Sequence, residues 1–196
     1  MKKYFILLLI TSLVVNISHS QLLGRIAGGL KKKMSKPKIK ETFYDNGKIQ
    51  SMETYISDDK EGLSKYYYEN GNVESEGNYV NDLKDSVWKY YYENGNLKRF
   101  GKYIIIDGYY EEDSIWKSYN QNGKLESEGN WSDGKKNGIW KFYYKNGQLK
   151  NEGNLIDDKQ NGIWKYYHKN GKLLGEGNYV DGKQMEFRNT IMKMGN

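Results

Sequence analysis

Few side chains in this chain of 196 residues have the chemistry that catalysis requires. Of the two histidines, His19 lies in the N-terminal segment, and His168 takes the place of a repeated tyrosine. Ser, Asp and Glu recur at regular positions, whereas an active site needs one unique set of converging groups. The sequence therefore predicts a protein that is not an enzyme, with no catalytic residues and no cofactor.

Metal-ligating patterns are equally scarce. Residues 157–162 read Asp-Asp-Lys-Gln-Asn-Gly and resemble the start of a calcium loop. However, Lys159 stands at a ligand position, and no Glu follows at the twelfth position of the loop. The chain has no cysteine and no glycine-rich phosphate loop. We therefore expect no metal site.

The dipeptide Asn-Gly occurs six times, with steps of 24, 24, 28, 24 and 24 residues. The pairs begin at Asn46, Asn70, Asn94, Asn122, Asn146 and Asn170. A fixed period of this length is typical of repeat architectures, in which each unit buries its apolar face against its neighbours. Asn-Gly between alternating apolar and polar residues also predicts a β-hairpin with a two-residue type I′ turn. About six tandem hairpins of 24 residues are expected.

Aromatic residues flank each Asn-Gly pair and favour a pleated, half-buried surface. Each unit has room for two strands of five or six residues, which is the usual strand length. No apolar residues recur with helical spacing. The predicted fold class is all-β, with the repeat array at 41–183.

A two-residue loop determines which residues face each other across a hairpin. In the fifth unit it pairs Phe142 with Asn151, Tyr143 with Lys150 and Tyr144 with Leu149. The same rule places every repeated tryptophan opposite a glycine, in the pairs Trp88–Gly101, Trp116–Gly129, Trp140–Gly153 and Trp164–Gly177. An indole can lie flat over a neighbouring strand only where no side chain stands up. These eight residues are therefore predicted to be structural, and Gly129→Val is expected to crowd Trp116.

Alternation along the strands divides the side chains between two faces. One face is apolar and includes Trp140, Phe142, Tyr144, Leu149 and Leu155, so we expect it to form the core. The other face pairs Lys with Glu across the strands, at Lys65–Glu76, Lys117–Glu128, Lys141–Glu152 and Lys165–Glu176. It also carries one tyrosine per unit. These tyrosines are predicted to bind a partner and are called the tyrosine row: Tyr67, Tyr91, Tyr119, Tyr143 and Tyr167.

The N-terminal segment has the features of an export signal. Residues 1–20 combine two lysines, a short apolar stretch and small residues before Gln21. We expect cleavage near Ser20/Gln21 and a secreted or periplasmic protein; the alternative is an uncleaved membrane anchor. Residues 21–40 are predicted to be a basic flexible tail, and residues 184–196 a C-terminal cap or tail.

The basic charge of the chain belongs to its N-terminal part. Lys and Arg number 31 against 25 Asp and Glu, a net charge of +6. Residues 1–20 hold two basic residues and residues 21–40 hold seven, with no acid in either segment, so 41–196 has a net charge of −3. Residues 24–40 suit an anionic membrane surface or act as a spacer. The acidic array disfavours binding of nucleic acid.

The repeats resemble the MORN family, in the variant form that occurs in tandem in bacterial proteins. The resemblance rests on Tyr-Tyr-Glu-Asn-Gly-Asn-Leu at 91–97, Asp-Gly-Lys-Lys-Asn-Gly-Ile-Trp at 133–140 and Gly-Glu-Gly-Asn-Tyr at 175–179. It implies an elongated antiparallel β-meander across 41–183. Such repeats serve as scaffolds, protein docking surfaces and lipid-associated modules, and some relatives are labelled as antitoxins.

The third unit contains an insertion that interrupts the period. Its residues include Tyr109, Tyr110, Glu111 and Glu112, which suit a basic partner or a cation; the alternative is a longer hairpin that the fold tolerates. The leading functional hypothesis is a secreted protein-interaction scaffold that binds another protein. The alternatives are a carbohydrate or cell-wall binding module, in which aromatic residues stack on sugars, and an antitoxin-like inhibitor of a protein.

Overall fold

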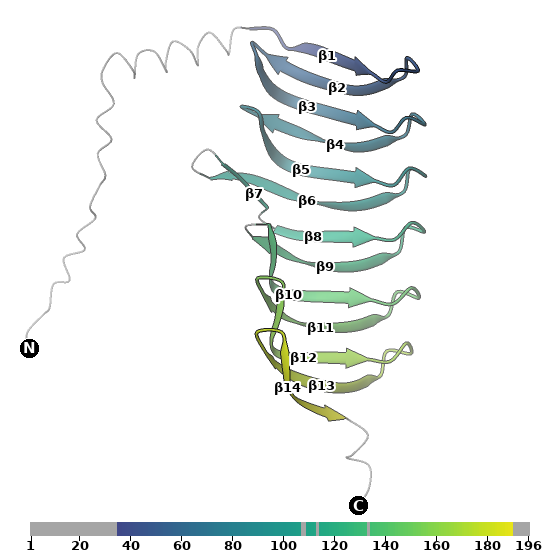
Figure 1. Cartoon of the computed structure of the whole chain (residues 1–196), viewed down its shortest axis with the longest axis vertical. Helices are drawn as coiled ribbons and strands as arrows, with labels where there is room; N and C mark the ends of the chain where they lie inside the picture. Colours follow the sequence, from purple (N-terminus) through teal and green to yellow (C-terminus); the bar gives the residue numbers. More distant parts are fainter. Residues whose placement is uncertain (1–34, 107–108, 113, 133, 190–196) are drawn as a thin grey trace, which may run out of the picture. The chain divides into compact units, whose positions relative to one another are not determined.

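The computed structural model describes residues 35–106, 109–112, 114–132 and 134–189, with side chains outside 105–114. In this part of the chain fourteen strands form one antiparallel sheet, in which successive hairpins lie side by side (Figure 1). The strands are β1 Lys38–Phe43, β2 Ile49–Ile56, β3 Asp59–Tyr67, β4 Val73–Val80, β5 Leu83–Tyr91, β6 Leu97–Ile106, β7 Tyr109–Glu112, β8 Ser114–Tyr119, β9 Leu125–Ser132, β10 Lys135–Tyr143, β11 Leu149–Ile156, β12 Lys159–Tyr167, β13 Leu173–Val180 and β14 Lys183–Asn189. The predicted all-β meander of hairpin repeats is confirmed. None of the described residues forms a helix that is long and apolar enough to cross a membrane.

The Asn-Gly turns differ from the predicted type I′ turns. At Asn46-Gly47, the glycine N–H bonds to the carbonyl of Tyr44, and Tyr44 N–H bonds to the carbonyl of Lys48. Only the glycine has positive φ, at 80°, so this is a three-residue loop with a type I turn and a left-handed glycine. The Asn46 side chain accepts a hydrogen bond from Lys48 N–H and stabilises the turn.

Type I′ turns occur instead at the other edge of the sheet. Asp157 and Asp158 both have positive φ, 50° and 68°, and connect the facing residues Ile156 and Lys159. Equivalent two-residue loops lie at 81–82 and 181–182. The described loop at 57–58 differs, because only Ser57 has positive φ there. The Asn-Gly pairs mark the longer loops.

A bulge compensates for the longer loop. Leu149, and not Lys150, lies opposite Tyr143, and the register then shifts by one residue before Phe142. From there inward, the predicted pairs are correct, including all four tryptophan–glycine pairs. The predicted pairs nearest the turn, Tyr143–Lys150 and Tyr144–Leu149, are wrong because they assumed a two-residue loop.

The core consists of tryptophans that lie on glycines of the preceding strand. Trp88, Trp116, Trp140 and Trp164 are each at most 1% exposed. A Cβ atom on Gly129 would collide with the indole of Trp140, and the same relation joins Gly101 to Trp116. Trp140 Nε1 also donates to the carbonyl of Asn130 at 2.9 Å. Gly129 therefore faces Trp116 across its hairpin, but it is Trp140 that occupies the space above it. The prediction that a side chain at position 129 would crowd Trp116 is wrong.

Two residues that were expected in the core have other positions. The hydroxyl of Tyr144 reaches the next hairpin and donates to the carbonyl of Tyr167 at 2.8 Å. Leu149 lies opposite Tyr143 and therefore belongs to the other face. The core around Trp140 contains Leu155, as predicted, together with Trp164 and Tyr179, and the predicted Phe142 packs against them.

The ends of the sheet lack the tryptophan–glycine pair. Near the first edge, Glu53 replaces the glycine and is buried, with hydrogen bonds from Lys60 Nζ and the Tyr66 hydroxyl at 2.6 Å each. At the other edge, Phe187 of β14 lies opposite Gly177 in the position of a tryptophan.

The first strand of the array begins at Lys38, three residues before the predicted boundary, and β14 includes residues 184–189 of the predicted cap. Residues 1–34 and 190–196 lie outside the described residues.

Ser86 provides a test of backbone strain. It has a φ of 59° at the bulge where equivalent positions are Gly138 and Gly162, with φ of 75° and 73°. Left-handed backbone costs a non-glycine residue about 1–2 kcal/mol, partly offset by the larger entropy of glycine in the unfolded chain. Ser86→Gly is expected to raise the free energy of unfolding by about 0.5–1 kcal/mol in urea titrations. Gly162→Ser is the control. No atom lies within 4 Å of the added Cβ, so a lower free energy of unfolding in this variant would come from the backbone conformation alone. An unchanged stability in both variants would contradict the assignment of strain.

Candidate functional site

The tyrosine row lies on the face opposite the tryptophans, and all five of its members are half-buried. Three of their hydroxyls donate to glutamates of the preceding repeat: Tyr91 to Glu76 at 2.8 Å, Tyr143 to Glu128 at 2.6 Å and Tyr167 to Glu152 at 2.8 Å. Tyr67 contacts the Met52 sulfur at 3.4 Å, and Tyr119 stacks on Phe100. These tyrosines connect neighbouring repeats, so much of their surface already serves the fold.

A row of facing residues with alternating charge runs beside the tyrosines. It crosses the sheet in the order Glu41, Met52, Lys65, Glu76, Lys89, Phe100, Lys117, Glu128, Lys141, Glu152, Lys165, Glu176 and Arg188. The four predicted Lys–Glu pairs are confirmed as facing pairs. Lys65 and Glu76 approach to 3.0 Å, and Lys117 and Glu128 to 3.1 Å. Opposite charges that face each other contribute about 0.2–1 kcal/mol per pair.

The tyrosine–glutamate contacts change the acidity of both partners. Burial and the hydrogen bond to Glu76 raise the pKa of Tyr91 to about 12. The hydrogen bond from Tyr143, together with that from Lys117, holds the pKa of Glu128 below its usual value despite partial burial. Glu128 therefore stabilises the fold above the pKa it has in the unfolded chain, and this contribution disappears as the pH falls through its folded pKa.

Tyr143→Phe tests this coupling. It removes the hydroxyl that donates to Glu128, so the pKa of Glu128 should rise toward its usual value. Hydrogen bonds to charged groups contribute about 1.5–3 kcal/mol, and we expect a loss of about 1.5 kcal/mol at pH 7. The loss should be smaller at pH 3 than at pH 7, because a growing fraction of Glu128 is protonated as the pH falls toward its folded pKa. Carboxyl NMR titration and urea unfolding at both pH values measure this. A Glu128 pKa that is the same in both proteins would rule out the coupling.

Sequence reasoning missed an exposed row of aliphatic side chains. One residue before each core position, an aliphatic side chain is 49–61% exposed: Leu63, Val87, Ile115, Ile139 and Ile163. These five residues are called the aliphatic row. Alternation places Ile139 on the same face as Lys141 and Tyr143, because Trp140 and Phe142 point to the core. The recurring aliphatic residue before each tryptophan was the available signal.

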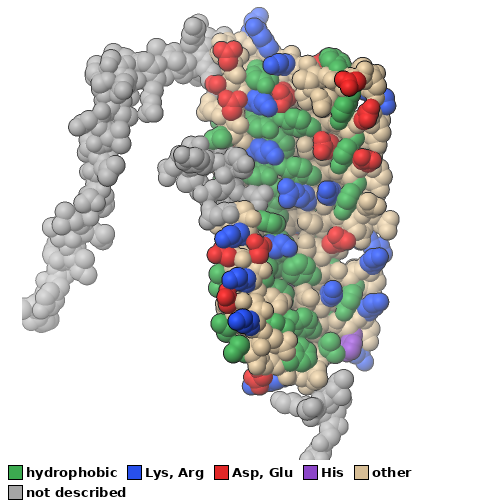
Figure 2. Space-filling model, in the orientation of Figure 1, with side chains coloured by type: hydrophobic (Ala, Val, Ile, Leu, Met, Phe, Trp, Pro, Cys, Tyr) green, Lys and Arg blue, Asp and Glu red, His purple; other side chains and the backbone are tan. Residues whose placement is uncertain are grey.

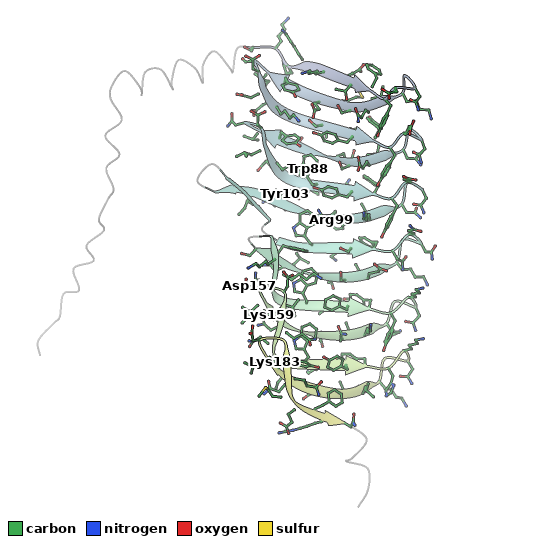
Figure 3. All side chains as sticks on the ribbon, viewed as in Figure 1. Trp88, Arg99, Tyr103, Asp157, Lys159 and Lys183 are labelled. Carbon is green, nitrogen blue, oxygen red and sulfur yellow. The ribbon has the colours of Figure 1, made fainter. Side chains whose placement is uncertain are left out.

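The tryptophan face forms a hydrophobic band in which Lys and Arg side chains are set (Figure 2). Lys84 Nζ lies 4.4 Å from the ring centroid of Trp88, and Arg99 lies 5.0 Å from that of Trp116. Trp88, Tyr103 and Arg99 come from neighbouring strands of this face (Figure 3). Since Trp88, Trp116, Trp140 and Trp164 are buried, these four are not available to stack on sugar rings, which removes one support for the carbohydrate hypothesis.

The insertion in the third unit forms a hairpin extension. The backbone of β7 pairs with the end of β6, with Tyr109 opposite Ile106 and Glu112 opposite Tyr103. The side chains of Tyr109, Tyr110, Glu111 and Glu112 lie outside the described part, so their predicted binding role remains a prediction. Among described residues, no group of three or more His, Asp or Glu side chains is arranged to hold a metal ion.

Comparison with solved structures finds matches of low sequence identity. The crystal structure of TarM is 10% identical over 86% of this chain and 24% of its own, with a TM-score of 0.29. The crystal structure of TcdB2-TccC3-TEV is 12% identical over 76% of this chain and 10% of its own, with a TM-score of 0.25. The chain thus spans a quarter or less of these proteins. No curated protein matches the sequence.

Comparison with protein families gives a clear result. The sequence profile described as MORN repeat variant matches residues 38–57, 60–81, 84–99, 112–133, 136–157 and 160–181. These matches cover more than half of the chain and follow the hairpins of the sheet. The chain therefore belongs to the MORN repeat variant family.

Proposed function

We propose that this protein is a non-enzymatic interaction scaffold, exported to the periplasm or the cell exterior, that binds another protein. The observation that carries the proposal is the aliphatic row, because it aligns five exposed apolar side chains on one face, and apolar surface gathered on one face marks interaction sites. MORN repeats suggest a repeat-based interaction module, which supports this reading. The tyrosine row and the facing residues of alternating charge lie beside the aliphatic row and form its polar border.

The spacing of the row favours a helical partner. Neighbouring members of the aliphatic row belong to successive hairpins, so they are two strands or about 10 Å apart. Seven residues of an α-helix rise by about 10.5 Å. An amphipathic helix with an apolar residue at every seventh position would therefore contact one member of the row per two turns.

Matched variants test this surface. Val87→Thr, Ile139→Thr and Ile163→Thr together remove apolar area but keep β-branched side chains that suit strands. The control carries Ile156→Thr and Val180→Thr, which are 50% and 54% exposed beside the type I′ turns. Purified proteins are used to capture partners from an envelope extract, with mass spectrometry as the readout. We expect a stoichiometric protein partner that the row variant loses and the control keeps. Equal capture by both variants, or capture of polysaccharide alone, would contradict the proposal.

The proposed export has its own test. Residues 1–20 resemble a cleavable signal, and the proposal requires that they are removed near Ser20/Gln21. Intact-mass analysis of the protein from cell fractions should find a chain that begins at or near Gln21 outside the cytoplasm. An uncleaved chain that remains in the cytoplasmic fraction would refute export.

A further inference from the structure

Tyrosines at the Asn-Gly turns connect each repeat to the next. The hydroxyl of Tyr68 donates to the carbonyl of Tyr91 at 2.8 Å, that of Tyr92 to Tyr119 at 2.9 Å, and that of Tyr144 to Tyr167 at 2.8 Å. The asparagine of the turn adds a second bond: the amide of Asn70 reaches the Glu93 carbonyl, that of Asn94 the Gln121 carbonyl, and that of Asn146 the Lys169 carbonyl. The turns thus form a hydrogen-bonded row along one edge of the sheet (Figure 1).

This row is interrupted at Asn120, which occupies the tyrosine position of the fourth repeat. Its short side chain bonds within its own turn, where Oδ1 accepts from Asn122 N–H at 3.0 Å and Lys124 N–H at 3.1 Å. In other repeats the asparagine of Asn-Gly accepts such a bond, as Asn146 does from Gln148 N–H. As a result, the Asn122 side chain makes no hydrogen bond to any described residue. The carbonyls of Tyr143 and Lys145 likewise receive no side-chain donor from the described turns.

A cleft of about 530 Å³ lies at this interruption. Its lining includes Tyr92, Asn120, Asn122, Lys124, Glu126 and Lys145. The volume lies in the usual range of small-molecule sites. Neither Lys124 nor Lys145 forms an ion pair within the described part of the chain. The cleft therefore combines an aromatic neighbour, the unused Asn122 amide, the Glu126 carboxylate and two lysines without an ion pair in the described part. The Tyr143 carbonyl belongs to the next hairpin, two residues before the lining residue Lys145.

We propose that this cleft binds a tyrosine side chain of a partner polypeptide, with an acidic residue beside that tyrosine. The neighbouring repeats supply the argument, because there a phenol fills the equivalent space and donates to the equivalent carbonyl. A partner's tyrosine would donate to the carbonyl of Tyr143 and lie beside the Asn122 amide. Lys124 and Lys145 would attract the adjacent acid. The identity of the partner as a protein rests on the proposed interaction function, whereas the chemistry of the cleft does not.

Two exchanges of side chains test the proposal in opposite directions. Asn120→Tyr should fill the cleft from within and complete the row, so it should raise Tm. Tyr68→Asn should open an equivalent cleft between the second and third turns and lower Tm. Amide NMR of the full chain is followed during titration with N-acetyl-L-tyrosinamide. We expect saturable shifts at residues 120–126 and 143–147, loss of these shifts in Asn120→Tyr, and new shifts at residues 91–95 in Tyr68→Asn.

Control ligands identify the group that is recognised. N-acetyl-L-phenylalaninamide lacks the hydroxyl and should bind about three- to tenfold more weakly, the usual effect of one neutral hydrogen bond. Equal binding of both amides, binding that persists in Asn120→Tyr, or no saturable shift would overturn the proposal. Shifts produced by N-acetylglucosamine and not by the tyrosine probe would assign the cleft to sugars and also overturn it. Since the titration uses no partner protein, its failure is distinguishable from failure of the capture experiment.

Discussion

Trp88→Ala is expected to lower the free energy of unfolding by about 3–5 kcal/mol, the usual cost of removing a buried aromatic side chain. Trp88 is 0% exposed and packs edge-on against Tyr79 and Tyr103, with ring centroids 5.1 and 6.4 Å away. Its Nε1 also donates to the Asn78 carbonyl at 3.0 Å. Urea unfolding followed by fluorescence measures the loss.

The position of the loss is also predicted. In a repeat array each unit contacts only its neighbours, so β4, β5 and β6 should exchange their amide hydrogens faster than distant strands. Val87→Ala is the matched control, since the adjacent Val87 is 49% exposed and surface substitutions usually stay within about 0.5 kcal/mol. If Trp88→Ala lowered the free energy of unfolding by less than about 1 kcal/mol, the indole would not be the main source of core stability in this repeat.

Gly129→Ala is expected to cost about 3 kcal/mol, at the upper end of the range for overpacking. The added Cβ would collide with the indole of Trp140, which lies flat on the Gly129 backbone and cannot move without losing its bond to Asn130. Thermal and urea unfolding measure the change.

A double-mutant cycle identifies which tryptophan is crowded. In a Trp140→Leu background, Gly129→Ala should add little, because the colliding ring is gone. In a Trp116→Leu background the full cost should remain, although Trp116 is the residue that faces Gly129 across its own hairpin. The reverse result would mean that the indole covers the following strand and not the preceding one.

The sequence by itself determined the repeat, the strands and the inner register. Its period places aromatic residues on alternate positions beside a turn. Only one pairing brings the four repeated tryptophans opposite glycines and also brings Lys65, Lys117, Lys141 and Lys165 opposite glutamates. Because side chains alternate with a period of two, a slip by one residue would expose the entire core face. That constraint explains why Trp140–Gly153 was correct although the assumed turn was wrong.

The type of the Asn-Gly turn could be assigned only from the backbone of the structure. Asn-Gly suits a type I′ turn, but it also suits a three-residue loop in which Asn bonds its own backbone and Gly alone is left-handed. Asp157-Asp158 carries no glycine, yet both residues adopt positive φ at the tight turn of the other edge. Local sequence did not separate these alternatives, because the register of the flanking strands decides between them.

Contacts between repeats were decided only by the tertiary structure. A glycine lies beside each tryptophan on both neighbouring strands, and only packing selects the preceding one. In the same way, the replacement of a tyrosine by Asn120 is an ordinary substitution in the sequence. In the structure this substitution leaves a cleft, because a tyrosine at this position would reach the next hairpin. In the equivalent pair, the hydroxyl of Tyr144 bonds to the carbonyl of Tyr167, 23 residues later. The sequence determined each hairpin through alternation and facing pairs, whereas the order in which side chains cover neighbouring hairpins follows from how they pack in space.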